Sequence, residues 1–166
     1  MRWHGVRLGA DLQPEALLGL RFEIEYLTLP GSNVLAIATT LRSLGPARSV
    51  QYQLDVEPVN EPEPPVLLLP DQAEVARGGV RGDSELRGNR WVSVEYPGTG
   101  HNTVLVSAVG DEVNVYEMGS LGFTLSGRLH AAIPPGGAAC ACHYVVLAEN
   151  RKQAALYASL ADLRGL

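Results

Sequence analysis

The sequence has 166 residues, enough for one domain over residues 1–166 that folds around a hydrophobic core without a metal or a disulfide. Its formal net charge is −5 and no dense run of Lys or Arg occurs, which excludes DNA and RNA as expected partners. The N-terminus has no apolar signal core and no stretch of about 18 apolar residues follows, so we expect a cytoplasmic protein with no membrane partner.

The first elements are predicted from short patterns. Residues 2–8 fit a short strand and residues 13–18 fit one helical turn. Residues 20–29, LRFEIEYLTL, alternate between apolar and polar side chains, which is typical of a strand with one face on a core. The inner face would hold Phe22, Ile24 and Tyr26, and the outer face Arg21, Glu23 and Glu25. That outer face is either simply solvated or a polar surface that faces a ligand.

Two further strands follow a turn at residues 30–33. Residues 34–41 are apolar on both faces, which predicts a strand in the centre of a sheet, paired with the preceding strand as a hairpin. Residues 49–56 alternate again, with Val50, Tyr52, Leu54 and Val56 inward. Four prolines within residues 58–65 predict an extended connection that crosses between two sheets, and a flexible interdomain linker is the alternative.

After this connection the pattern is weak and then becomes regular. A short apolar strand follows the prolines, and residues 71–87 are expected to be loop with one short strand at residues 78–81. Between residues 90 and 129, four runs rich in β-branched and aromatic residues are separated by Gly, Pro, Asn or Asp, which predicts a meander of antiparallel strands. In the first run one face, Val92, Val94 and Tyr96, would lie on a core, and the other, Trp91, Ser93 and Glu95, would be partly wet.

A meander needs a second layer against its apolar face, so the sequence predicts an all-β protein, an antiparallel β-sandwich with a short C-terminal α-helix. The last strand is expected at residues 138–147, covered on both faces apart from His143. Asn150 as N-cap and Gln153 three residues later form a capping box before the terminal helix.

Cys140 and Cys142 are the only cysteines. On a strand they share one face, with a geometry that is poor for a disulfide, so we expect buried free thiols in a reducing cytosol. The ring of His143 would point away from both sulfur atoms, and we therefore expect no metal site. No P-loop, GxSxG, HExxH or paired CxxC motif occurs, and neither a cofactor nor a catalytic residue is predicted.

A ligand site is most plausible around the turn YPGTGHN. A histidine in a polar turn is usually only solvated, but His101 lies at a strand end close in sequence to aromatic and charged residues. An aromatic plane, a bidentate donor and a titratable group suit sugar recognition or acid–base chemistry. The candidate ligand-binding residues are Arg90, Trp91, Glu95, Tyr96 and His101.

Two passages resemble parts of the galactose-mutarotase-like supersandwich domains. They are FEIEYLTLPGSNVLAIATTLRSLG and AAIPPGGAACACHYVVLAENRKQAALYASL, which together cover about a third of the chain. Full supersandwich domains are longer, so the chain would be a reduced version or a fragment, and the catalytic histidines and glutamate of that family match no position here. The resemblance implies an all-β, carbohydrate-associated domain without catalysis of its own.

Three functions fit these patterns, in this order. The first is a non-catalytic β-sandwich module that binds a carbohydrate or supports a sugar-processing partner. The second is a structural protein that forms a homo-oligomer through a sheet face or its terminal helix. The third is a small epimerase or mutarotase that uses His101 and a carboxylate.

Overall fold

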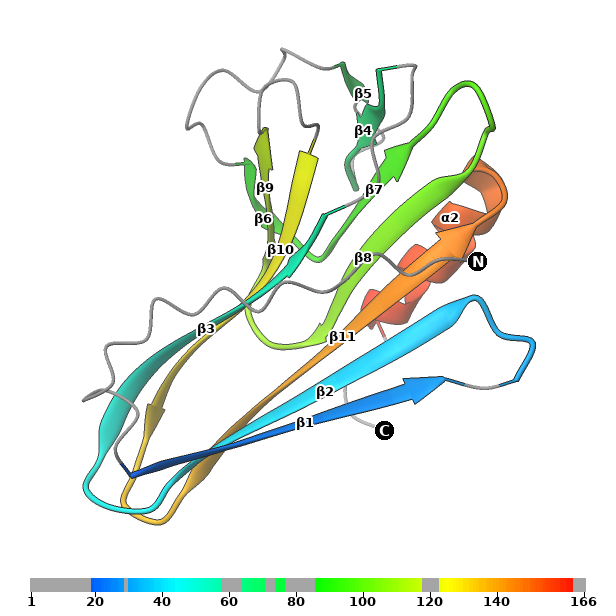
Figure 1. The fold of residues 1–166 in the computed structure, drawn as a ribbon. Helices are drawn as coiled ribbons and strands as arrows, with labels where there is room; N and C mark the ends of the chain where they lie inside the picture. Colours follow the sequence, from blue (N-terminus) through cyan, green and yellow to red (C-terminus); the bar gives the residue numbers. More distant parts are fainter. Residues whose placement is uncertain are drawn as a thin grey trace.

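The computed structural model describes residues 19–28, 30–57, 64–70, 74–76, 86–117 and 123–162. Within these ranges the chain forms two antiparallel β-sheets and one short helical segment, which confirms the predicted all-β sandwich (Figure 1). The elements predicted at residues 2–8, 13–18 and 78–81 lie outside the described residues. No helix in the described part of the chain has the length and apolar character needed to cross a membrane.

The larger sheet has the strand order β1-β2-β11-β8-β7-β4-β5 and the smaller sheet the order β3-β10-β9-β6. The larger sheet consists of β1 (Leu20–Thr28), β2 (Val34–Ser43), β4 (Val66–Leu68), β5 (Glu74–Ala76), β7 (Trp91–Glu95), β8 (Asn102–Val109) and β11 (Ala138–Ala148). The smaller sheet consists of β3 (Arg48–Val56), β6 (Leu86–Asn89), β9 (Val113–Glu117) and β10 (Phe123–Ile133). After β11 the chain continues into helix α2 (Arg151–Ala158) and the 3-10 turn η2 (Ser159–Asp162).

The predicted hairpin at the start of the described chain is confirmed. β1 pairs with β2 through a turn in which Gly31 has a φ of 76°. β2 lies between β1 and β11, as its two apolar faces predicted. β1 itself is an edge strand, so Phe22 and Tyr26, expected on the core, remain 45% and 50% exposed.

The chain changes sheets six times along the described strands, and two of these changes bear on the predictions. β3 belongs to the smaller sheet and β4 to the larger one, which supports the crossover interpretation of the proline-rich connection, although residues 58–63 lie outside the described ranges. The second of these two changes is between β8 and β9, at Gly110, where φ is 135°. The predicted continuous meander is therefore wrong at this point: it consists of two strand pairs, one in each sheet.

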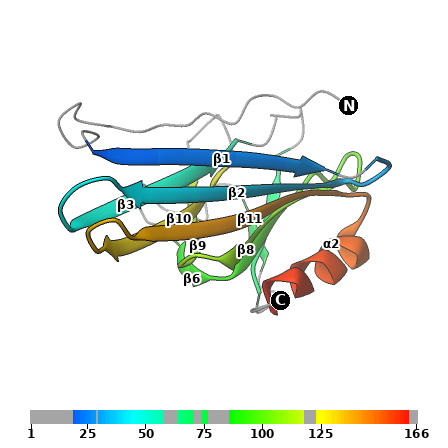
Figure 2. The ribbon, with the colours of Figure 1, turned by 90° about the horizontal axis from the view of Figure 1, so that it is seen from below.

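The core lies between the two sheets and includes the fully buried Leu54, Leu105 and Leu125. The inward face of β7 joins it as predicted. The opposite face was expected to be partly wet. This holds for Trp91, which is partly exposed, and is wrong for Ser93, which is fully buried, and Glu95, which is 9% exposed. Helix α2 packs over the outer side of β7, β8 and β11, which the alternation of a single strand could not reveal (Figure 2).

β11 places its cysteines and its histidine on opposite faces. Cys140 and Cys142 point outward as free thiols, and the expectation that both are buried is wrong, because Cys140 is exposed and Cys142 is only half-buried. The helix covers other outward residues of this strand, such as Val146, and leaves Cys140 uncovered. His143 was expected to be the one residue of this strand that is not covered. It is instead fully buried, and its ring lies against Gly127 of β10.

Candidate functional site

The five residues predicted to bind a ligand lie at several places on β7 and the turn after it. Arg90 and Tyr96 flank opposite ends of β7, and Tyr96 is buried in the core between the sheets. Trp91 packs on the other side, in the apolar cluster beneath helix α2. Glu95 and His101 lie at the end of β7 and in the turn before β8, where His101 is exposed. The structure thus brings Glu95, Tyr96 and His101 to one end of the strand and leaves Arg90 at the other.

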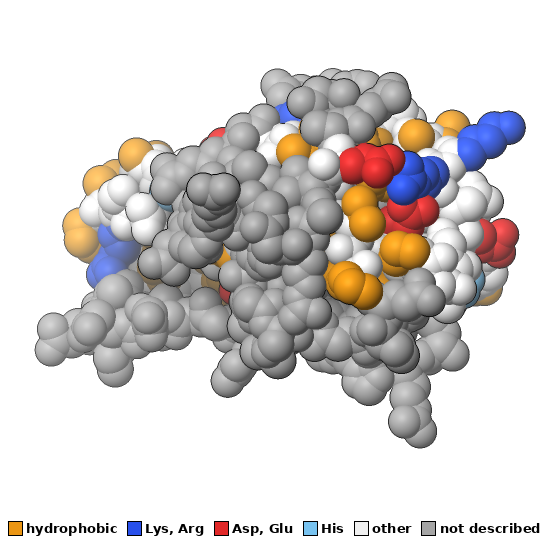
Figure 3. Space-filling view, turned by 90° about the horizontal axis from the view of Figure 1, so that it is seen from above, with side chains coloured by type: hydrophobic (Ala, Val, Ile, Leu, Met, Phe, Trp, Pro, Cys, Tyr) orange, Lys and Arg blue, Asp and Glu red, His pale blue; other side chains and the backbone are white. Residues whose placement is uncertain are grey.

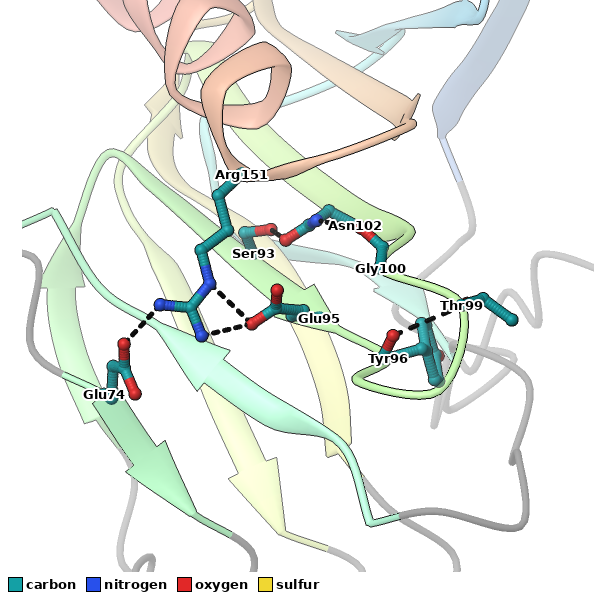
Figure 4. Close-up of polar contacts among 8 residues, drawn as sticks. All are labelled: Glu74, Ser93, Glu95, Tyr96, Thr99, Gly100, Asn102 and Arg151. Atoms are coloured by element: carbon teal, nitrogen blue, oxygen red, sulfur yellow. Dashed lines mark hydrogen bonds and ion pairs between the residues drawn. The ribbon is translucent and has the colours of Figure 1, made fainter.

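At the turn between β7 and β8, polar side chains from four elements form a strand-end cluster: Glu74, Ser93, Glu95, Asn102 and Arg151 (Figure 4). Arg151, the first residue of α2, donates from Nε to Glu95 Oε2 at 2.7 Å and also pairs with Glu74. The hydrogen bonds to Glu95 and then Glu74 raise the pKa of Arg151. Acidic and basic side chains accordingly lie side by side on the face seen in Figure 3.

The remaining groups of the strand-end cluster bond to each other. Ser93 donates to Asn102 Oδ1 at 3.1 Å, and the Asn102 amide donates to the carbonyl of Gly100 at 3.0 Å. A ligand at this place would have to displace these bonds. We therefore interpret the strand-end cluster as an anchor that holds α2 against β5 and β7.

A second polar region was missed by sequence reasoning. It lies on the outer face of the smaller sheet, where the alternate residues of β3, β9 and β10 point away from the core. The register places Ser126 between Asp55 and Asn114, Arg128 opposite Gln53, and His130 opposite Gln51. We call this surface the polar face, and it comprises Gln51, Gln53, Asp55, Asn114, Tyr116, Ser126, Arg128 and His130.

Hydrogen bonds order the centre of the polar face. Asp55 Oδ1 accepts from Gln53 Nε2 at 2.8 Å and from the hydroxyl group of Ser126. The guanidinium of Arg128 lies 5.5 Å from the centre of the Tyr116 ring, a cation–π geometry. Both hydrogen bonds go to Oδ1 of the Asp55 carboxylate, which has a second acceptor atom, Oδ2.

The edge of the polar face is held by the connection between β8 and β9. His130 Nδ1 lies 2.7 Å from Asp111 Oδ2, and the His130 backbone N–H donates to the same oxygen at 2.5 Å. Arg90 fixes the backbone of this connection, because its guanidinium donates to the carbonyls of Ala108, Gly110 and Asp111 at 3.1, 3.2 and 2.6 Å. Arg90, predicted to contact a ligand, thus supports the residue that orients His130.

The sequence predicts only part of the polar face. The outward residues of β3 and β10 are polar in the alternating pattern, but nothing in that pattern tells which strands are neighbours. The polar face presents a carboxylate, amides, a guanidinium, an imidazole and an aromatic ring, which are the groups that bind a polyhydroxyl compound. Among the described residues, no three His, Cys, Asp or Glu side chains are grouped so that they could hold a metal ion.

Comparison with known proteins finds similarity only at the level of structure. No family model matches the chain, and no curated protein matches it. The Slr1438 protein from Synechocystis sp. PCC 6803 has a TM-score of 0.55 and 11% identity over 79% of this chain and 55% of its own. A candidate aldose 1-epimerase from Klebsiella pneumoniae has a TM-score of 0.59 and 13% identity over 88% of this chain and 51% of its own.

A third solved structure is a galactose mutarotase-related enzyme from Lactobacillus acidophilus. Its TM-score is 0.53, with 12% identity over 80% of this chain and 63% of its own. At these identities the comparisons show the fold alone: the β-sandwich of this chain is similar to those of aldose 1-epimerase-like and galactose mutarotase-related structures, in line with the sequence resemblance. The chain spans between half and two-thirds of the length of these three structures.

Proposed function

We propose that this β-sandwich binds a carbohydrate on the polar face and has no catalysis of its own. The observation that carries the proposal is the partly exposed carboxylate of Asp55 on the outer face of the smaller sheet, held by the buried Ser126 and flanked by the partly exposed Arg128. A fold shared with a candidate aldose 1-epimerase and a galactose mutarotase-related enzyme supports a sugar as the ligand class. The strand-end cluster is a weaker choice, because its two carboxylates, Glu74 and Glu95, are both in ion pairs with Arg151.

The geometry of the polar face suits sugar hydroxyl groups. Asp55 would accept from a hydroxyl through Oδ2, and the partly exposed guanidinium of Arg128, two residues further along β10 from Ser126, could donate to a neighbouring hydroxyl. Tyr116 supplies an aromatic ring one row further along. Because Gln53 and Ser126 already hold Asp55, little conformational entropy is lost when a ligand binds.

Binding without catalysis is favoured by the spacing of the titratable groups. Acid–base chemistry on a sugar needs two groups within roughly 5–10 Å that act on one bond. Asp55 lies opposite Ser126 and the His130–Asp111 pair lies four residues along β10, roughly 13 Å away at strand spacing. His143, enclosed between the sheets, cannot reach a ligand on the outer face.

The cytoplasm is our proposed location. Cys140 and Cys142 are free thiols, and Cys140 is exposed on the sheet surface. Exposed thiols of this kind persist in a reducing compartment.

The test is calorimetric titration with a panel of monosaccharides and disaccharides. We expect at least one sugar to bind, and Asp55→Asn with Gln53→Ala to weaken it at least tenfold, because a lost charge-assisted hydrogen bond costs about 1.5–3 kcal/mol. His101→Ala is the matched comparison at the strand-end turn, and its affinity should equal that of the wild type. If no sugar in the panel binds, the proposal is wrong. If only His101→Ala loses binding, the binding site is at the β7–β8 turn instead.

Catalysis is tested separately by polarimetry. The rate at which a pure sugar anomer equilibrates should be the same with and without the protein. Acceleration that disappears in His101→Ala would support the epimerase or mutarotase alternative instead, and acceleration that disappears in His130→Ala would place catalysis on the polar face.

A further inference from the structure

The outer edge of β1 has the features of an interaction surface. Among the described strands, β1 pairs only with β2, and no described strand pairs with the N–H and C=O groups of its other edge. Three of the large exposed hydrophobic side chains lie on this one strand: Phe22, Tyr26 and Leu27 are 45%, 50% and 58% exposed. Such a concentration of apolar surface at a sheet edge marks a place where another chain can bind.

We propose that β1 pairs antiparallel with β1 of a second copy of this chain, so that the two larger sheets join into one continuous sheet. This interaction is independent of the proposed sugar binding, because the polar face belongs to the smaller sheet. The charged side chains of β1 indicate that the partner is a second copy of this chain. Arg21 and Glu23 form an exposed ion pair at 2.5 Å on the outward side of β1.

The charges select one register. Residues that oppose each other in an antiparallel pair lie on the same face of the sheet. When Phe22 lies opposite Phe22 of the partner subunit, Arg21 lies opposite Glu23 of the partner subunit, and by symmetry the same ion pair forms a second time. On the inward side Leu20 would then meet Ile24 of the partner subunit, which adds an apolar contact.

Neighbouring registers place like charges together. A two-fold axis at Ile24 would set Glu23 opposite Glu25 of the partner subunit at two places. An axis at Glu23 would set Arg21 opposite Glu25 of the partner subunit at two places, but it would also set Glu23 against its own copy, a repulsion that the axis at Phe22 avoids. Like charges directly opposite each other destabilise a strand pair. The favoured overlap is residues 20–24, because Gly19, with a φ of 80°, leaves the extended conformation. Of the three exposed hydrophobic side chains of β1, this overlap contains Phe22, and Tyr26 and Leu27 lie beyond it. So short an overlap predicts a dimer that dissociates on dilution.

Sedimentation velocity over a wide concentration range tests the proposal. The wild type should shift from monomer to dimer as concentration rises. Arg21→Glu should raise the dissociation constant of the dimer about tenfold or more. In this variant residue 21 of each copy is a glutamate opposite Glu23 of the other copy, so two repulsive pairs replace the two ion pairs. The exchange variant Arg21→Glu with Glu23→Arg should restore dimerisation, since it reforms both ion pairs with reversed polarity.

Lys152→Glu is the control, because it makes the same change of charge on helix α2, away from β1. Circular dichroism checks that each variant keeps the β-sheet signal. The proposal is overturned if the wild type stays monomeric at all concentrations, if Arg21→Glu dimerises like the wild type, or if the exchange variant remains monomeric while folded.

Discussion

The ring of His143 occupies the space that a side chain at Gly127 would need. A Cβ atom added to Gly127 would overlap Cδ2 and Nε2 of the buried imidazole. We expect Gly127→Ala to lower the free energy of unfolding by about 1–3 kcal/mol through overpacking, measured by urea denaturation. Gly45→Ala is the control, because no atom lies within 4 Å of its added Cβ. If the clash is the cause, His143→Ala in the same chain should relieve part of the loss.

His143 also makes stability depend on pH. Burial first, and then the charge of Arg90, lower its pKa from 6.5 to about 4. Between these two values the unfolded chain binds a proton that the folded chain does not. The free energy of unfolding therefore falls as pH falls from 6.5 to 4, by about 3 kcal/mol from this residue.

Urea unfolding at neutral pH and near pH 4.5 measures this effect. His143→Leu should flatten the difference between the two conditions, whereas the exposed His101→Ala should leave it unchanged. An equally steep loss of stability in His143→Leu would assign the acid sensitivity to other groups.

At the scale of elements, the terminal helix depends on its cap. The Asn150 side chain accepts from the Gln153 N–H at 3.0 Å, and the Gln153 side chain accepts from the Glu149 N–H at 2.6 Å. We expect Asn150→Ala to lower the free energy of unfolding by about 1 kcal/mol. Asn150→Asp should retain the stability, because a carboxylate accepts the same hydrogen bond. Thermal unfolding followed by circular dichroism distinguishes the two, and equal losses would contradict a capping role.

Elements whose signal is local were predicted well. The positions of strands β1 and β3, the double apolar face of β2, and the N-cap of α2 all depend on residues close in sequence, whereas the exposure of Phe22 on β1 depends on the place of that strand at the sheet edge. The change of sheet at Gly110 and the cover that α2 gives to β7 depend on contacts between distant segments. The polar face was missed for the same reason, because Asp55 and Ser126 meet only when β3 pairs with β10.

At the scale of the whole molecule, the two proposed interactions use different sheets. The polar face lies on β3, β9 and β10, and the proposed dimer contact lies on β1. We therefore expect the monomeric variant Arg21→Glu to bind a sugar with the wild-type dissociation constant, measured by calorimetry. A clear change in that constant would mean that the two surfaces are coupled.

The hydrogen bonds from Arg90 to the carbonyls of Ala108, Gly110 and Asp111 determine which positions of the chain tolerate circular permutation. Opening the backbone at residues 110–112 would release the passage from one sheet to the other, so a circular permutant with its new ends there should fail to fold. The exposed residues Pro97 to Thr99 make a turn closed mainly by bonds to the carbonyl of Tyr96. That turn is the better site at which to insert a reporter for building a sensor from this protein.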